Sequence, residues 1–510
     1  MEYVDITKLL TDIPLSEQEK DPDLSNPIQV LKQRMNESDI PKLRDRKIWM
    51  INSTATGGGV AEMLPRILYT LRSFDMKVEW MVITANDMPE FFNITKKLHN
   101  FIHGQNPSKA PVQFTDEERD IFEKVNRKNA EDFVKNYLKK GDIVMIHDPQ
   151  PSAMITTIRE KFSKTEVPCF WRCHIGLDFE TTETKAAWNF LKKYVTQYDL
   201  TVFSAKEYVP DFAPDPRIVY PSLHPLDFKN KFLSFFETKS ILAKAGLFPC
   251  DSKYLSDDEK YPYKIKMLRS DKNFVVPAED ETLSQYGFLD RPLLFQISRW
   301  DSLKGWTELI DAFVDIKKNP KKYIDQGPEG KEQERFIERM GLVLAGPDSS
   351  KIADDPEGLQ VFMGLVDQIC ALPNEIQSSI AMLSLPLDSR WQNALIVNAL
   401  QRLATVCIQN SIREGFGLTL TEAMWKQRPC IASDACGLRQ QLRPGVDGIM
   451  IKDPLKSENV AKAIGEMIRA GEDKRQLFAR NAKKRAMDNF LVYAQVAGYL
   501  NCVRDIALTK

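Results

Sequence analysis

The chain lacks three features that mark particular classes of protein: a disulfide framework, a large net charge and long apolar runs. It has 8 cysteines among 510 residues, and they are scattered through apolar segments. That scatter favours reduced thiols. A formal net charge of −1 excludes binding of nucleic acid or anionic membrane by bulk electrostatics. No stretch approaches the roughly 18 uninterrupted apolar residues of a membrane span.

The first residues are acidic and contain no basic region followed by an apolar one, so the sequence predicts no secretory signal. We expect a cytoplasmic protein. Hydrophobic residues make up 43% of the chain and charged residues 28%, which is ordinary for a globular protein. The length favours two large domains or three small ones, each able to bury a core of its own.

A repeated order of elements predicts an α/β protein. Short apolar runs are followed by a polar or glycine-bearing turn and then by a stretch of helical period, which is typical of parallel sheets covered by helices. Strands are expected at Lys47–Ser53, Val78–Thr84, Asp142–His147, Pro168–His174 and Leu200–Ala205, and again at Pro292–Ser298, Gly341–Gly346, Ile380–Leu385, Thr405–Asn410 and Pro429–Ser433. We therefore predict two doubly wound domains.

The pattern also divides the chain. Residues 1–227 form the first predicted domain, with a helical N-terminal extension. Residues 228–290 are rich in Lys, Asp and Tyr and are interpreted as an inserted or linking segment on the surface. Residues 291–480 form the second domain. Residues 481–510 form a predicted C-terminal helix. One option is that this helix crosses back to the first domain.

The strongest functional pattern lies at Ser411–Gln427, where a glycine-containing loop joins a predicted strand to a predicted helix beginning near Gly417. Free backbone N–H groups and the positive end of the helix dipole suit a phosphate. Glu414 and Glu422 lie on either side of this loop and are more suited to neutral hydroxyls, as on a sugar or ribose. An equally weighted alternative is a simple turn, with Glu422 capping the helix start.

Two cations follow another strand of the second domain. Arg299 and Lys304 come after Pro292–Ser298, at the carboxyl edge where ligands of open α/β sheets collect. There they could hold a diphosphate and stabilise charge on a departing phosphate. Taken alone, two basic residues in a loop are more often solvated surface.

The first domain carries two further patterns. Three glycines, Gly57–Gly59, join a strand to a helix, but they match neither the dinucleotide-binding fingerprint nor a Walker A loop. His147, Asp148 and His174 leave the ends of two strands at the same predicted edge. A strand-end histidine is usually structural, although two at matching positions favour function. Cys169, Cys173 and His174 make a poor metal site, and no metal is predicted.

With these residues in place, the chain resembles the retaining, GT-B-fold glycosyltransferases of family 4. The family pattern is two glutamates separated by seven residues, with an arginine and a lysine upstream. Within that family the chain is similar to the group of trehalose synthases and trehalose phosphorylases. The resemblance to this group rests on the strings NSTATGGGVAEML, HDPQP, WRCHIGLD, DDPEG, VNALQR and REGFGLTLTEAMWK, which together span roughly Lys47–Asp453.

The resemblance implies a GT-B fold whose two domains face a central cleft, and it implies site residues. The implied catalytic residues are His174, Arg299, Lys304 and Glu414. The implied donor-binding residues are Gly58, Gly59, Arg299, Lys304, Gly415, Phe416, Gly417, Leu418 and Glu422. The implied acceptor-binding residues are His147 and Asp148. Glu422 would contact the ribose, and His174 the transferred sugar.

We therefore expect a retaining glucosyltransferase that uses a nucleotide-glucose donor, either ADP- or UDP-glucose, and a sugar acceptor, glucose above all, to make trehalose. No cofactor is expected, because the nucleotide-sugar or phosphate is a substrate and fixed cations can replace a metal. Homodimerisation is one option. Four alternatives stay open: a trehalose phosphorylase, a transferase with another acceptor, a nucleotide-sugar epimerase, and a catalytically silent binding or scaffold protein.

Overall fold

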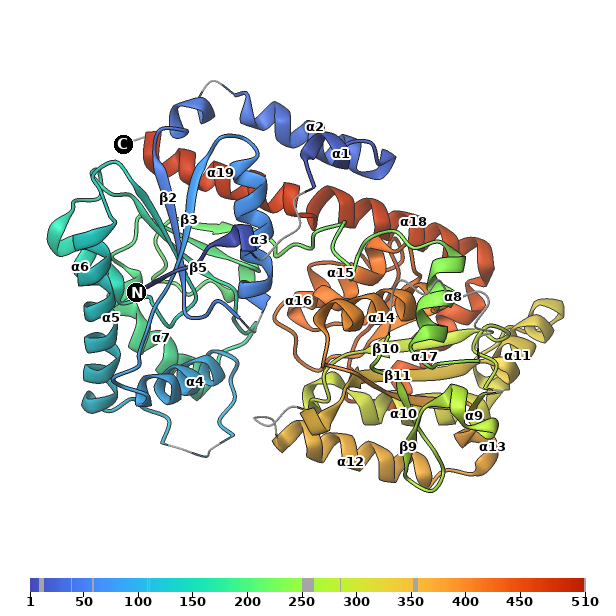
Figure 1. Cartoon of the computed structure of the whole chain (residues 1–510). Coiled ribbons are helices and arrows are strands. Elements are labelled where there is room, and N and C mark those ends of the chain that lie inside the picture. Colours follow the sequence, from blue (N-terminus) through green and yellow to red (C-terminus); the bar gives the residue numbers. More distant parts are fainter. Residues whose placement is uncertain are drawn as a thin grey trace. The chain divides into compact units, whose positions relative to one another are not determined.

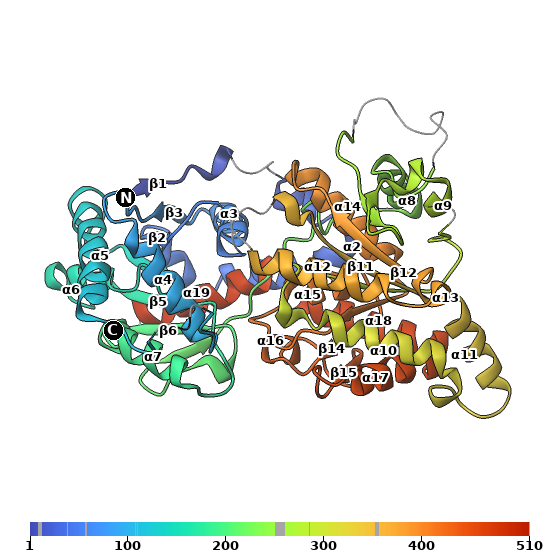
Figure 2. The same ribbon diagram turned by 90° about the horizontal axis from the view of Figure 1, so that it is seen from below.

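The computed structural model describes residues 1–8, 13–37, 39–56, 59–107, 109, 111–249, 261–284, 286–351 and 356–508. The chain folds as two compact units. The first unit contains Met1–Leu223 and Met487–Lys510, and the second contains His224–Ala486. Each unit has one sheet with helices on both faces (Figures 1 and 2).

The sheet of the first unit has seven strands in the order β1-β3-β2-β4-β5-β6-β7. All neighbours pair in parallel except β1, which runs antiparallel to β3. The strands are β1 (Glu2–Tyr3), β2 (Lys47–Asn52), β3 (Lys77–Val82), β4 (Ile143–His147), β5 (Cys169–Cys173), β6 (Leu200–Phe203) and β7 (Pro216–Ile218). Because β2 lies between β3 and β4, the strand order reverses at β2, and ligands of open α/β sheets bind beside the carboxyl ends of the strands at such a point.

Amphipathic helices cover this sheet. They are α1 (Leu15–Gln18), α2 (Pro22–Met35), α3 (Gly59–Arg72), α4 (Glu90–Ile102), α5 (Asp116–Asn136), α6 (Met154–Lys161), α7 (Thr182–Val195) and α19 (Val492–Leu508). Helix α3 buries Leu64, Ile67, Leu68 and Leu71, which recur at helical spacing along one face. Helix α19 packs against α2 and α3, so the end of the chain contributes to the first unit.

The sheet of the second unit has the order β15-β14-β13-β10-β11-β12-β8-β9. Its strands are β8 (Lys266–Leu268), β9 (Phe274–Val275), β10 (Leu293–Ile297), β11 (Gly341–Pro347), β12 (Ile380–Leu385), β13 (Val406–Gln409), β14 (Cys430–Ser433) and β15 (Ile449–Ile451). Strands β10 to β15 are parallel, whereas β8 and β9 are antiparallel additions at one edge. Here the order reverses at β10, between β11 and β13.

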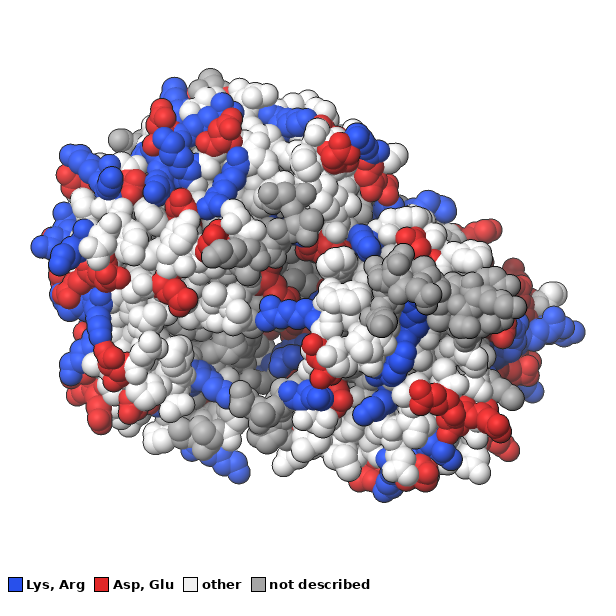
Figure 3. Space-filling model, in the orientation of Figure 1, with Lys and Arg blue, Asp and Glu red and all other residues white. Residues whose placement is uncertain are grey.

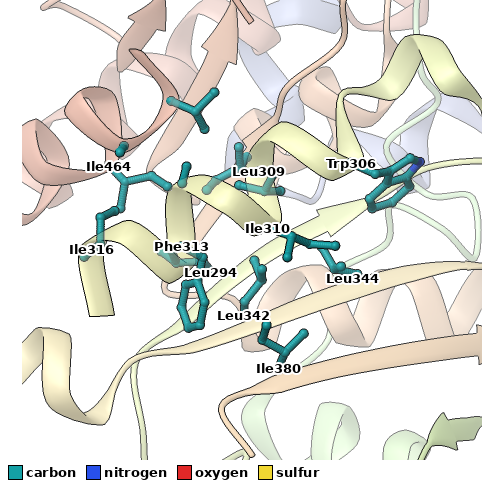
Figure 4. Close-up of a cluster of buried hydrophobic side chains, with 14 of the residues drawn as sticks. Leu294, Trp306, Leu309, Ile310, Phe313, Ile316, Leu342, Leu344, Ile380 and Ile464 are labelled. Atoms are coloured by element: carbon teal, nitrogen blue, oxygen red, sulfur yellow. The ribbon is translucent and has the colours of Figure 1, made fainter. Parts of the chain in front are cut away.

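The helices of the second unit are α8 (Phe235–Lys244), α9 (Glu281–Ser284), α10 (Trp306–Lys318), α11 (Pro328–Arg339), α12 (Pro356–Cys370), α13 (Asn374–Gln377), α14 (Arg390–Leu403), α15 (Leu418–Trp425), α16 (Cys436–Arg439), α17 (Ser457–Arg469) and α18 (Gly471–Asn489). Side chains from α10, α17 and the sheet meet in a buried cluster (Figure 4). Leu309, Phe313 and Ile464 are fully buried there. This core holds α10 on the sheet and fixes the loop that precedes it.

The predicted α/β class with two doubly wound sheets is confirmed. All ten predicted strands are present, and each lies within a residue or two of its expected bounds. Strands β8 and β9 fall within 228–290, the segment interpreted from sequence as an insertion, and they extend the second sheet. The long C-terminal helical pattern is divided at Phe490–Leu491, where backbone hydrogen bonds to Leu223 interrupt it between α18 and α19.

The surface agrees with the balanced composition. Basic and acidic side chains alternate over the face shown in Figure 3, without one sign covering it. None of the helices in the described parts of the chain combines the length and the hydropathy that a transmembrane span needs.

Candidate active site

The predicted site residues of the second unit lie at its switch point. The loop after β10 carries Arg299 and Lys304, and the loop after β13 carries Glu414 to Gly417. Because β10 and β13 are neighbouring parallel strands, their carboxyl ends bring both loops to one place.

Lys304 and Glu414 meet there. The Lys304 ammonium lies 2.6 Å from Oε2 of Glu414, and the two side chains are only 12% and 16% exposed to solvent. Ion pairs that are mostly shielded from water are stronger than surface pairs. The pair therefore sets a fixed cation and a fixed carboxylate side by side beside the glycine loop.

Hydrogen bonds from β10 and from the residue that follows β13 hold the backbone around Lys304. Gln296 on β10 donates to the Lys304 carbonyl at 2.8 Å and accepts from the Asn410 N–H at 2.9 Å. Asn410 in turn donates to the Gly305 carbonyl at 2.9 Å. Gly305 has φ 58°, and a Cβ there would collide with Asn410. Only glycine suits this turn, which aims Lys304 at the second loop.

A short polar network supports Glu414. Nε2 of Gln409 donates to the hydroxyls of Ser298 and Ser411 at 2.9 and 3.0 Å. The Ser411 hydroxyl donates to Glu414 Oε2 at 3.1 Å. Gln409 and Ser411 are buried, so this network resists rearrangement. The carboxylate oxygen that receives Lys304 is thus held by two donors.

The glycine loop is closely packed. Gly417 has φ 84°, and a Cβ there would collide with Leu438. Gln441 donates to the carbonyls of Phe416 and Gly417. Phe416 is buried, and α15 begins at Leu418, as the sequence predicted. The start of α15 therefore has a fixed direction, and its N–H groups can face an anion.

Glu422 lies inside α15 and does not cap it; the N-cap is Gly417, which has no side chain to accept a hydrogen bond. Glu422 is buried, with Oε2 accepting from Gln401 at 3.1 Å and Oε1 lying 3.7 Å from the Lys229 ammonium. Burial lowers the pKa of neighbouring Lys426 to about 7, against the opposing effect of Glu422. Because Gly417 is the N-cap and Glu422 lies inside the helix, the alternative that Glu422 caps the helix start is excluded.

Arg299 differs from Lys304. Its side chain is 67% exposed and donates to Asp301 at 3.2 Å. The Lys304 ammonium, in contrast, is directed at the loop after β13. The structure thus brings Lys304 and Glu414 together and leaves Arg299 at the outer side of the same loop.

In the first unit, two predicted histidines meet. His147 ends β4 and His174 follows β5, so the parallel pairing of these strands places them side by side. Nδ1 of His147 lies 3.1 Å from Nε2 of His174, and the rings stack at 5.4 Å. Burial, reinforced by the Arg172 guanidinium, lowers the pKa of His147 to about 3 and also lowers that of His174. Both rings are therefore neutral at pH 7.

Asp148 lies in the same cluster. Its φ is 65°, an uncommon backbone conformation that aspartate tolerates, and Oδ1 accepts a hydrogen bond from the backbone N–H of His174 at 2.9 Å. Burial raises the pKa of Asp148 to about 6, although this hydrogen bond and Arg172 act in the opposite direction. The remaining ring nitrogens, Nε2 of His147 and Nδ1 of His174, are buried and have no hydrogen-bond partner among the described residues. Such a cluster can exchange hydrogen bonds with hydroxyl groups.

Only one glycine of the run Gly57–Gly59 lies among the described residues. Gly57 and Gly58 lie outside the described residues, as do the first two residues of the DDPEG string. Gly59 begins α3, and a Cβ there would meet no atom within 4 Å. Among the described residues, no group of three or more His, Cys, Asp or Glu side chains is placed to hold a metal.

The sequence reasoning missed several residues that build the site. Arg172 is fully buried and donates to Ser204 at 3.0 Å and to the Val219 carbonyl at 2.8 Å. A charge inside the apolar strand CFWRC was an available signal. Gln409, Ser411 and Gln401 gave no comparable signal, because their roles depend on contacts between distant segments.

Two family models match parts of this chain. Residues 50–210 match the family "Trehalose synthase, N-terminal domain", and residues 389–485 match "Glycosyl transferases group 1". A trehalose synthase of Thermococcus litoralis is 30% identical over 465 residues, which cover 91% of each chain. A trehalose phosphorylase of Pleurotus pulmonarius is 25% identical over 80% of this chain and 51% of its own length.

Among solved structures, a UDP-forming trehalose-phosphate synthase from Burkholderia xenovorans has a TM-score of 0.61 and 18% identity, and it covers 91% of this chain and 99% of its own. At that identity the likeness shows the fold, which is GT-B. The sequence relatives extend the likeness to the enzyme class. The chain is a trehalose-related glycosyltransferase and belongs to the trehalose synthase family.

Proposed function

We propose that the protein is a retaining glucosyltransferase that transfers glucose from a nucleotide-glucose, ADP- or UDP-glucose, to a sugar acceptor, most simply glucose to give trehalose. The observation that carries this proposal is the 2.6 Å pair of Lys304 and Glu414 beside the start of α15. A cation and a helix start suit a diphosphate, and a carboxylate suits the hydroxyls of the attached sugar.

The proposed donor half lies in the second unit. Lys304 and the N–H groups at the start of α15 would hold the diphosphate, and Arg299 would turn toward it from its exposed position. Glu414 would bind hydroxyls of the glucose, and Glu422 would bind the ribose after exchanging its contact with Lys229. No metal is required in this proposal, because these groups supply fixed positive charge where the leaving group becomes anionic.

The proposed acceptor half lies in the first unit. Asp148 and His147 would accept and donate hydrogen bonds to acceptor hydroxyls, and His174 would contact the transferred glucose. Neutral imidazoles are suited to this task, because they both donate and accept without adding charge near a developing oxocarbenium ion.

The proposed step balances without a protein nucleophile. The bond from the anomeric carbon to the phosphate oxygen breaks with its electron pair going to the nucleoside diphosphate. The acceptor oxygen then bonds to the same face of the anomeric carbon, and its proton passes to the departing phosphate oxygen. Lys304 and Ser411 both donate to Oε2 of Glu414, and a carboxylate held in this way suits hydroxyl binding better than nucleophilic attack.

A product assay tests this proposal. Purified protein is incubated with ADP-glucose or UDP-glucose and with glucose or other sugars, and products are identified by NMR. We expect α,α-trehalose together with one equivalent of nucleoside diphosphate. Glucose 1-phosphate formed from trehalose and phosphate, with no transfer from either nucleotide-glucose, would identify a phosphorylase instead. Release of an epimer with no acceptor consumed would identify an epimerase.

A further inference from the structure

One buried side chain lies under the glycine loop of the second unit. Gln441 is fully shielded from solvent, and its Nε2 donates to the carbonyls of Phe416 and Gly417, to the latter at 3.2 Å. The same nitrogen donates to the carbonyl of Gly437 at 3.2 Å. Its Oε1 accepts from the Thr421 hydroxyl at 2.6 Å. The three carbonyls set the orientation of this amide, because only its nitrogen can donate to them.

The backbone that carries Gln441 is itself held in place. Arg485 of α18 donates to the carbonyl of Gln440 at 2.8 Å and to the carbonyl of Gln441. Helix α16 approaches the glycine loop so closely that a Cβ on Gly437 would lie 2.5 Å from the loop backbone. The Gly437 N–H also donates to the Glu414 carbonyl at 3.1 Å. The loop therefore lies against a fixed support within the second unit.

The two loop carbonyls that accept from Gln441 determine the direction of two N–H groups. The peptide bonds here are trans, and in a trans peptide the C=O and N–H bonds point in opposite directions. The Phe416 carbonyl shares its peptide with the Gly417 N–H, and the Gly417 carbonyl shares its peptide with the Leu418 N–H. Because one nitrogen of Gln441 donates to both carbonyls, both N–H groups point away from Gln441.

These two N–H groups suit an anion. Neither donates a hydrogen bond to another residue in the described part of the chain. Gly417 has φ 84°, and successive N–H groups in a turn of this kind form a concavity that binds anions. Leu418 is the first residue of α15, so the positive end of the helix dipole lies at the same place.

We propose that Gln441 is a positioning residue for the donor diphosphate, because it turns the N–H groups of Gly417 and Leu418 toward that anion without touching it. The inference rests on the proposed function and names the residue that prepares its donor half. A glutamate in place of Gln441 would set a buried carboxylate against three carbonyls. Acceptors that face each other away from water are costly, so the peptides of the loop would have to turn or move.

Calorimetric titration of ADP, UDP and inorganic pyrophosphate tests the inference. We expect Gln441→Glu to bind the anion about tenfold or more weakly than the wild type, with a lower kcat, because two donors to the leaving phosphate are misdirected. The matched control is Gln333→Glu. Gln333 is also buried in the second unit and donates to Asp325 at 2.8 Å, so a carboxylate there meets an acceptor as well. Both variants should lower the melting temperature, but only Gln441→Glu should weaken anion binding.

Thr421 provides a milder test, which holds even if Gln441→Glu does not fold. Thr421→Val removes the donor to Gln441 Oε1 and nearly keeps the side-chain volume. We expect the dissociation constant for the anion and the donor KM to rise about threefold, because the amide loses one of its anchors. Thr421→Ser keeps the hydroxyl and should restore both values. The acceptor KM should be unchanged in each variant.

The outcomes separate this inference from the proposed function. Nucleotide binding that is as tight in every folded variant of Gln441 and Thr421 as in the wild type would overturn the inference and leave the proposed donor in place. Binding of pyrophosphate but of neither nucleotide, weakened by these variants, would support the inference and contradict the proposed donor. A wild type that binds none of the three anions would overturn both.

Discussion

The donor half and the acceptor half of the proposed site use opposite kinds of chemistry. In the donor half, Lys304 and Glu414 are an ionised pair, with Arg299 exposed beside them. In the acceptor half, His147 and His174 are buried and neutral at pH 7, and Asp148 is half-buried, with a pKa that burial raises to about 6. A fixed cation suits a diphosphate, whereas neutral imidazoles and a carboxylate without a neighbouring lysine suit sugar hydroxyls. Each half therefore matches one substrate, and variants in each half should affect different kinetic constants.

The largest effect is expected from Lys304→Ala. Loss of a fixed cation at the leaving group should lower kcat about 10²–10³-fold, the range seen when one preorganised donor to a developing anion is removed. Circular dichroism should be unchanged, since Gln296 still holds the turn through the backbone. The control is Lys351→Ala, which breaks a 3.0 Å ion pair with Asp388 in the same unit and should not alter turnover. Near-normal turnover in Lys304→Ala would contradict the assignment of the donor half.

Arg299→Ala should have a smaller effect. The side chain is directed at Asp301 before substrate binds, so its contribution depends on movement toward the diphosphate. We expect a rise of about tenfold in the KM for the donor. Arg299→Lys should recover part of this loss, because the charge remains while the planar fork is lost. An unchanged donor KM in both variants would show that Arg299 stays on the surface.

A pH profile distinguishes the acceptor half. Because the pKa of Asp148 is raised to about 6, nearly all of this side chain is ionised well above pH 6, and the carboxylate becomes protonated as the pH falls through 6. We expect kcat/KM for the acceptor to fall below pH 6 in the wild type. Asp148→Asn, which tolerates the same positive φ, should lower the plateau about tenfold and abolish that inflection. A variant that retains the inflection would assign it to another group.

The smallest effect is expected from Ser411→Ala. This variant removes one of the two donors to Glu414 Oε2 and leaves Lys304 in place. A positioning role predicts a donor KM raised about threefold with an unchanged acceptor KM. A purely structural role would lower the melting temperature without separating the two constants. Ser302→Ala, which removes an exposed hydrogen bond from Ser302 to Glu357, serves as the control and should leave the donor KM unchanged.

The sequence predicted the parts of this protein that depend on local pattern. The parallel strands were found because each is a short apolar run, and the loops after β10, β13 and β4 followed from strand order. Strands β1, β7, β8, β9 and β15 were missed because they have only two or three residues. That Lys304 faces the loop after β13 was expected from the sheet edge, whereas its ion pair with Glu414 and the exposure of Arg299 depend on side-chain direction. Lys229 and Gln401 could not be assigned to Glu422, because only the folded chain brings the three together.

Calorimetric titration of UDP and ADP into the wild type, Lys304→Ala and Asp148→Asn tests the division between the halves most directly. We predict that at least one nucleotide binds the wild type and Asp148→Asn equally, and that Lys304→Ala binds it at least tenfold more weakly. Loss of nucleotide binding in Asp148→Asn, with binding retained in Lys304→Ala, would contradict the account.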